Sequence, residues 1–109
     1  MATRKSEVTV MNLEEMAEHA DEAIQLLKAL SNRSRLMVLC ILSDGELSVG
    51  ELLERVPLSQ SALSQHLAVL RRDELVATRR EAQTVFYSLQ DENAARVVSL
   101  LHEMYCEPT

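Results

Sequence analysis

Several residue types are rare in this 109-residue chain, and each scarcity excludes something. Trp is absent and aromatic residues make up 3%, so the core must be built from aliphatic side chains and Met. Two Gly and two Pro allow few tight turns, which favours long helices. No apolar run approaches the roughly 20 residues that span a bilayer, and residues 1–12 lack the features of a secretion signal. These absences predict a cytoplasmic protein without membrane contact.

The composition is that of a single globular domain, residues 1–109, in which we expect residues 1–11 to be flexible. The net charge of −6 argues against general affinity for nucleic acid, because phosphate contacts need Lys or Arg. The charges are unevenly distributed, however. Residues 59–87 carry four basic and three acidic side chains, whereas the segments before and after them are net negative.

Apolar residues at three- and four-residue steps predict amphipathic helices over 12–30 and 91–106. Asn12 and Asp91 are suited to cap their first turns. A second helix, ending near residue 42, is apolar on all sides and is therefore expected to be central and buried.

The middle of the chain predicts a helix-turn-helix over 48–72. Ser48 and Glu51 form a capping-box pattern at its first helix, and Ser59 can cap its second. Residues 75–89 then alternate in polarity on either side of Glu81-Ala82-Gln83, which predicts a β-hairpin. The expected order is α-α-α-α-β-β-α, a mainly α fold with a small hairpin.

The helix over 59–72 has two unlike faces. Leu63, Leu67 and Leu70 mark the inward side, where His66 is expected to pack with a hydrogen bond. The outward side carries short Ser and bidentate Gln side chains, which suit base edges in a DNA major groove: Gln60, Ser61, Ser64 and Gln65. Arginines on the helix end and the first hairpin strand are placed to hold phosphates: Arg71, Arg72, Arg79 and Arg80.

Three stretches carry a family resemblance: "LLKALSNRSRLMVLCIL", "LSVGELLERVPLSQSALSQHLAVLRRDELV" and "RREAQTVFYSL". Together they resemble the ArsR/SmtB family of winged helix-turn-helix bacterial regulators. The resemblance implies a homodimer formed by the helices over 12–30 and 91–106, which binds an inverted-repeat operator in double-stranded DNA. It also implies base contacts from Gln60, Ser61, Ser64 and Gln65, and a wing over residues 79–85 in which Gln83 is a further DNA-binding residue.

The metal sites of the resembled family are largely missing. An arsenic-type site resembles "ELCVCDL", but this chain has Ser48 and Gly50 in place of the two thiols. A zinc-type site needs His where the last helix has Asn93 and Met104, although Asp91 is present. The sequence therefore predicts neither of these metal sites and no cofactor.

Two cysteines remain, Cys40 and Cys106. Considered alone, Cys40 is an ordinary small core residue and Cys106 an incidental thiol near a terminus. Within the family, however, the chain resembles the HlyU-, SqrR- and BigR-like branch. The resemblance implies that a disulfide or sulfur bridge between the two positions changes DNA affinity. The hypothesis is a dithiol switch in which reactive sulfur or an oxidant joins Cys40 to Cys106.

Two other chemistries could involve these cysteines. A zinc ion could be held by His102, Cys106, Cys40 and an acid such as Glu103, with His19 on the neighbouring interface helix. An enzyme using the His102–Cys106 pair is rejected, because nothing in the sequence supplies an orienting third group, an oxyanion hole or a substrate cleft.

Overall fold

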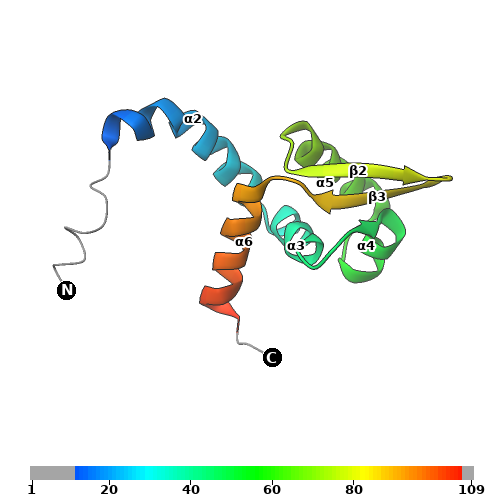
Figure 1. Ribbon diagram of the computed structural model, residues 1–109. Helices are drawn as coiled ribbons and strands as arrows, with labels where there is room; N and C mark the ends of the chain where they lie inside the picture. Colours follow the sequence, from blue (N-terminus) through cyan, green and yellow to red (C-terminus); the bar gives the residue numbers. More distant parts are fainter. Residues whose placement is uncertain (1–11, 107–109) are drawn as a thin grey trace.

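The computed structural model describes residues 12–106. Within these residues there are five helices and a small sheet; the β2–β3 hairpin projects from one side, and the first helix extends away from the body of the domain (Figure 1). In chain order the elements are α2 (Leu13–Leu30), α3 (Arg33–Leu42), β1 (Leu47–Ser48), α4 (Val49–Arg55), α5 (Gln60–Arg72), β2 (Val76–Glu81), β3 (Thr84–Leu89) and α6 (Glu92–Tyr105). The mainly helical class with a small hairpin is confirmed. The expectation that residues 1–11 are flexible concerns residues outside the described range.

The helix boundaries follow from side-chain caps. At each helix start an Asn, Ser or Asp side chain accepts a backbone N–H from the first turn: Asn12, Asn32, Ser48, Ser59 and Asp91. At Ser48 both halves of the capping box are present, because the Glu51 carboxylate also accepts the Ser48 N–H at 2.8 Å.

The predicted element order needs one correction. The residue pair Leu47–Ser48 forms a short strand, β1, that pairs antiparallel with β3, so the sheet has three strands in the order β1-β3-β2. Two residues are too few to produce a polarity period, and their partners Tyr87 and Phe86 lie far along the chain. The pairing of β1 attaches the start of the helix-turn-helix to the hairpin.

The hairpin turn is also shorter than predicted. Glu81 closes β2 opposite Thr84, which leaves Ala82 and Gln83 as the two turn residues. Ala82 has a φ of 56°, the positive value that a two-residue hairpin turn requires and that Gly more often supplies.

One core lies where α3, α5 and α6 meet the sheet. Its fully buried large side chains are Val38, Leu39, Leu52, Leu63, Leu67, Leu70, Val76 and Val98. The prediction that α3 is buried on all sides is wrong for Met37, which is 46% exposed. The neighbours of α3 are α2, α5, α6 and the sheet, and they leave the side of α3 that carries Met37 uncovered.

The apolar stripe of α2 remains largely uncovered within one chain. Leu13 and Leu27 are 74% and 55% exposed, and only Ala29 and Leu30 of this helix are buried. The end of α2 is held by Arg35 of α3, whose guanidinium donates to the carbonyls of Ala29 and Lys28 at 2.9 and 3.0 Å. None of the helices within residues 12–106 combines the length and the apolarity needed to cross a membrane.

Candidate DNA interface and cysteine pair

The two faces of α5 are separated as the sequence predicts. Leu63, Leu67 and Leu70 are buried with 0–1% exposure. The polar side chains of the other face are all exposed: Gln60, Ser61, Ser64 and Gln65. Because no acidic residue lies in the first turn of α5, its positive dipole end is not neutralised by a carboxylate. The exposed start of α5 is therefore suited to approach a polyanion.

His66 is half-buried beside the leucines, as predicted. The expected hydrogen bond is absent: the His66 ring forms no hydrogen bond with any residue from 12 to 106. Its place in the fold is that of a packing residue.

The end of α5 is closed by a Schellman motif. The N–H of Leu75 donates to the carbonyl of Leu70, and that of Glu74 to the carbonyl of Arg71, both at 2.9 Å. Glu74 occupies the left-handed position of the motif with a φ of 61°, where Gly is usual. Arg71 and Arg72 in the last turn are exposed at this end.

The register of the hairpin places its two arginines on opposite faces. Arg80 pairs with Val85 and shares a face with Tyr87 and Val76, the face that packs towards α5. Arg79 pairs with Phe86 on the other face. Arg80 is exposed, and no acidic side chain within residues 12–106 forms an ion pair with it.

Arg79, by contrast, is already bound. Its guanidinium donates twice to the Glu46 carboxylate, at 2.8 and 3.0 Å, and lies 4.6 Å from the centre of the Phe86 ring. The hydrogen bonds from Arg79 lower the pKa of Glu46 below its ordinary value. Glu81 adds a longer ion pair at 3.7 Å. This cluster fastens β2 to the turn between α3 and β1.

A residue that the sequence analysis missed lies between α5 and the wing. Tyr87 lines a hollow of about 460 Å³ together with Ser64, Ala68, Arg71 and Arg72. The sequence analysis placed it only within the alternating residues of the predicted hairpin. The available signal was its place in the hairpin at the end of the positive segment, residues 59–87, but only the tertiary fold brings it beside the two arginines.

Both cysteines are free thiols, and they come from elements that pack together. Cys40 is half-buried on α3, and Cys106 is exposed at the end of α6, where its N–H donates to the His102 carbonyl at 2.8 Å. Burial raises the pKa of the Cys40 thiol, and a negative charge on Cys106 raises it further. The tertiary fold thus brings two cysteines that are distant in sequence within electrostatic reach of each other.

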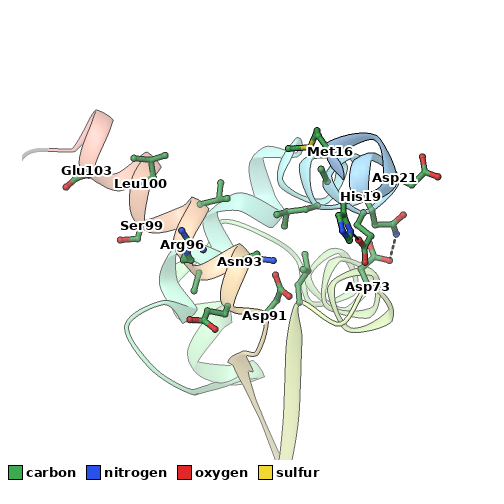
Figure 2. A pocket seen from close by; sticks show the side chains of 18 residues that line it. Met16, His19, Asp21, Asp73, Asp91, Asn93, Arg96, Ser99, Leu100 and Glu103 are labelled. Atoms are coloured by element: carbon green, nitrogen blue, oxygen red, sulfur yellow. Dashed lines mark hydrogen bonds and ion pairs between the residues drawn. The ribbon is translucent and has the colours of Figure 1, made fainter. Parts of the chain in front are cut away.

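A groove of about 1330 Å³ opens between α2 and α6. Figure 2 shows Met16 and His19 on one side of the groove, Asn93 and Arg96 on the other, and Asp73 at the end of α5. No three His, Cys, Asp or Glu side chains within residues 12–106 of one chain converge on a point that could hold a metal ion. The sites suggested for zinc at His102, Cys106, Cys40 and Glu103 are therefore not assembled within a single copy.

Comparison with known proteins gives a consistent result. The family model for "Bacterial regulatory protein, arsR family" matches residues 32–78, which span α3, the helix-turn-helix and the start of the wing. The transcriptional activator HlyU of Vibrio cholerae is 59% identical over 97 residues, 89% of this chain and 90% of HlyU. A biofilm growth-associated repressor of Xylella fastidiosa is 43% identical over 103 residues, 94% of this chain and 90% of the repressor.

Solved structures extend the similarity to three dimensions. The structure described as reduced HlyU from Vibrio cholerae superposes with a TM-score of 0.82 at 57% identity, covering 86% of this chain and 99% of that one. The overall fold is therefore shared with proteins that regulate transcription.

Proposed function

The chain belongs to the arsR family of bacterial regulatory proteins and is a DNA-binding transcriptional regulator, not an enzyme. From that premise we propose that it binds an inverted-repeat operator as a homodimer. We propose further that Cys40 and Cys106 control this binding. The observation that carries the DNA part of this proposal is the outward Ser and Gln face of α5, flanked by exposed arginines on a scaffold of this family.

In the proposed complex the outward face of α5 enters the major groove. Base edges are contacted by Gln60, Ser61, Ser64 and Gln65. A Gln side chain can pair with adenine through two hydrogen bonds, and a Ser hydroxyl can hydrogen-bond to several bases. The phosphates are held around this face by Arg71, Arg72 and Arg80, with Gln83 at the wing tip. Arg72 is 69% exposed and donates only its Nε to Asp73, so its terminal nitrogens remain for a phosphate. Tyr87 joins this set, since its ring lines the hollow beside Arg71 and Arg72.

Arg79 has a supporting role in this proposal. Its guanidinium is held by Glu46 on the wing face opposite to Arg80, so a phosphate contact would require that the ion pair be broken. The pair keeps the wing in place against the start of the helix-turn-helix, and Arg80 makes the phosphate contact.

The dimer is supported by the uncovered apolar residues of the two terminal helices. On α2 these are Leu13, Met16, Ile24 and Leu27, and on α6 they are Leu100, Met104 and Tyr105, each 48–78% exposed. Exposed apolar side chains in such a row mark an interaction surface. The groove between α2 and α6 lies within it, and a second copy is the proposed occupant. A two-fold dimer presents two α5 helices to half-sites about one DNA turn, 34 Å, apart.

The proposed switch assigns different tasks to the two thiols. Cys106 is exposed and reacts first: its thiolate takes the outer sulfur of a persulfide RSSH, giving Cys106–SSH and releasing RS⁻. The Cys40 thiolate then attacks the inner sulfur of Cys106–SSH, forming a disulfide and expelling HS⁻. With peroxide, a Cys106 sulfenic acid forms first, and its condensation with Cys40 releases water. In a cytoplasm that keeps thiols reduced, such a bridge is a signal rather than a permanent staple.

Two observations support the thiol assignment. Helix α3, which carries Cys40, packs on α6, whose end carries Cys106, and burial followed by the Cys106 charge raises the pKa of Cys40. The solved relative is described as reduced HlyU, which names a redox state of that protein. A bridge between α3 and α6 would tie the helix that supports α5 to the proposed dimer interface and would thereby disturb the spacing of the two α5 helices.

The test joins intact mass to DNA binding. Untagged protein is exposed without oxygen to an organic persulfide and, separately, to peroxide, and each product is titrated against a duplex selected by the reduced protein from random DNA. We expect Cys40 and Cys106 to become joined and affinity to fall, while Cys106→Ser protein neither bridges nor releases DNA. If Cys106→Ser still releases DNA, the switch is wrong. If the purified wild-type protein contains stoichiometric zinc and the Cys106→Ser protein does not, metal sensing replaces the thiol proposal.

A further inference from the structure

One side-chain hydrogen bond joins α2 directly to the end of α5. The Gln25 amide Nε2 donates to Oδ1 of Asp73 at 2.9 Å, across 48 positions of sequence. The same oxygen accepts from Nε of the neighbouring Arg72 at 3.2 Å. Asp73 is the C-cap of α5, and Figure 2 shows it where α5 ends below α2.

The position of Asp73 is unfavourable for a carboxylate in two respects. The C-terminus of a helix carries the negative end of its dipole, which favours cations over anions. The Asp73 side chain is also only 7% exposed, so its charge has lost most of its contact with water. Donors from Gln25 and Arg72 offset both costs. The contact between Gln25 and Asp73 is thus a specific one, made by an exposed amide to a largely covered carboxylate.

The packing of the helices gives this contact its importance. Helix α2 packs mainly on α3, while α5 packs on α3 and β2. The hydrogen bond from Gln25 is therefore a direct link from a proposed dimerisation helix to the helix that is proposed to read DNA.

We propose that Gln25 is a positioning residue that sets the angle between α2 and α5, and so the half-site spacing that the dimer accepts. This inference rests on the proposed function, since it needs a dimer that reads two half-sites. Gln25 does not touch DNA. It acts through Asp73, whose position determines where the last turn of α5, with Arg71 and Arg72, is directed.

Operator spacing offers a direct readout. Inserting or deleting one base pair between the half-sites moves one of them by about 3.4 Å along the axis and rotates it by roughly a tenth of a turn. A dimer whose α5 helices are held at a fixed angle rejects such a change. A dimer with loosened α5 helices accepts several spacings, each less tightly.

The variants separate the hydrogen bond from other effects of substitution. Gln25→Met keeps the length of the side chain and removes the donor, whereas Gln25→Lys keeps a donor for Asp73. Glu18→Met is the matched control, because Glu18 is exposed two turns earlier on the same side of α2 and forms no side-chain hydrogen bond or ion pair within residues 12–106. Thermal unfolding of each variant confirms that it is folded.

The probes are a duplex that wild-type protein selects from random DNA, the same duplex with one base pair added or removed at its centre, and a single half-site. For Gln25→Met we expect a roughly three- to tenfold loss on the selected duplex, little change on the half-site, and a weaker preference for the selected spacing. Gln25→Lys and Glu18→Met are expected to keep the wild-type preference.

The possible failures are distinguishable. Equal loss on the half-site and the full duplex, or an unchanged spacing preference in Gln25→Met, would overturn the positioning role and leave the proposed function standing. Selection of no inverted repeat by the wild-type protein would overturn the proposed function, and the role of Gln25 with it.

Discussion

Replacing Arg80 by Ala should lower the salt dependence of DNA binding, whereas replacing Arg79 should not. The two arginines are neighbours in sequence, but the β2–β3 register puts Arg80 on the face towards α5 and Arg79 on the face that bears Phe86. Arg80 has no acidic partner within residues 12–106, while Arg79 is bound twice by Glu46. A free guanidinium can neutralise a phosphate, and one already paired adds no net positive charge.

The magnitude follows from counterion release. Each neutralised phosphate contributes about 0.9 to the slope of log affinity against log salt concentration, so the two wings of a dimer contribute about 1.8. Over the fourfold range from 50 to 200 mM salt, this slope corresponds to about a twelvefold change in affinity. Affinity of the Arg80→Ala protein should therefore fall about twelvefold less than that of wild type over this range.

The assay is a fluorescence-anisotropy titration of a labelled duplex at several salt concentrations. The same titrations on random-sequence DNA should show the same change for Arg80→Ala, because a phosphate contact carries no base information. Arg79→Ala serves as the matched control, with the wild-type slope expected. Equal reductions of slope in the two variants would refute the reasoning from register and ion pairing.

Three further outcomes are expected. Gln65→Ala should relax base preference, with selected and random duplexes binding more alike, and unchanged discrimination in competition titrations would contradict a base-reading role. Near neutral pH, a pulse of iodoacetamide should label Cys106 before Cys40, because burial raises the pKa of the Cys40 thiol and only the thiolate reacts. Labelling of Cys40 should accelerate once the pH exceeds the ordinary thiol pKa. Peptide mass spectrometry showing Cys40 labelled first would count against the assigned order of attack. Glu74→Gly should stabilise the fold by about 0.5–1 kcal/mol in urea unfolding, because it relieves the strain of a left-handed backbone at the end of α5. A loss of stability would mean that the Glu74 side chain stabilises the fold by more than this strain costs.

Local chemistry accounts for most of what the sequence predicted correctly. Helix starts at Asn12, Ser48, Ser59 and Asp91 depend on a cap and the few residues after it, so they are legible without a fold. The separation of α5 into a leucine face and a Ser/Gln face follows in the same way from a period of 3.6 residues.

The failures share a different cause, since each depends on residues far apart in the chain. Strand β1 has two residues and exists only through its pairing with Tyr87 and Phe86. The exposure of Met37 reflects which sides of α3 its neighbours leave open. Tyr87 could be recognised as a candidate DNA contact only when α5 was packed beside the wing.

The helices, the hairpin, the two faces of α5 and the two cysteines could all be predicted from the sequence, because each depends on contiguous residues or on composition. The tertiary structure alone decided that Arg79 and Arg80 differ, since strand register sends them to opposite faces and Glu46 reaches only one. It alone brought Cys40 into the field of Cys106 and Gln25 to Asp73. Hydrogen bonds and charge interactions act over a few ångströms in space, whatever the distance along the chain, and only folding determines which groups meet.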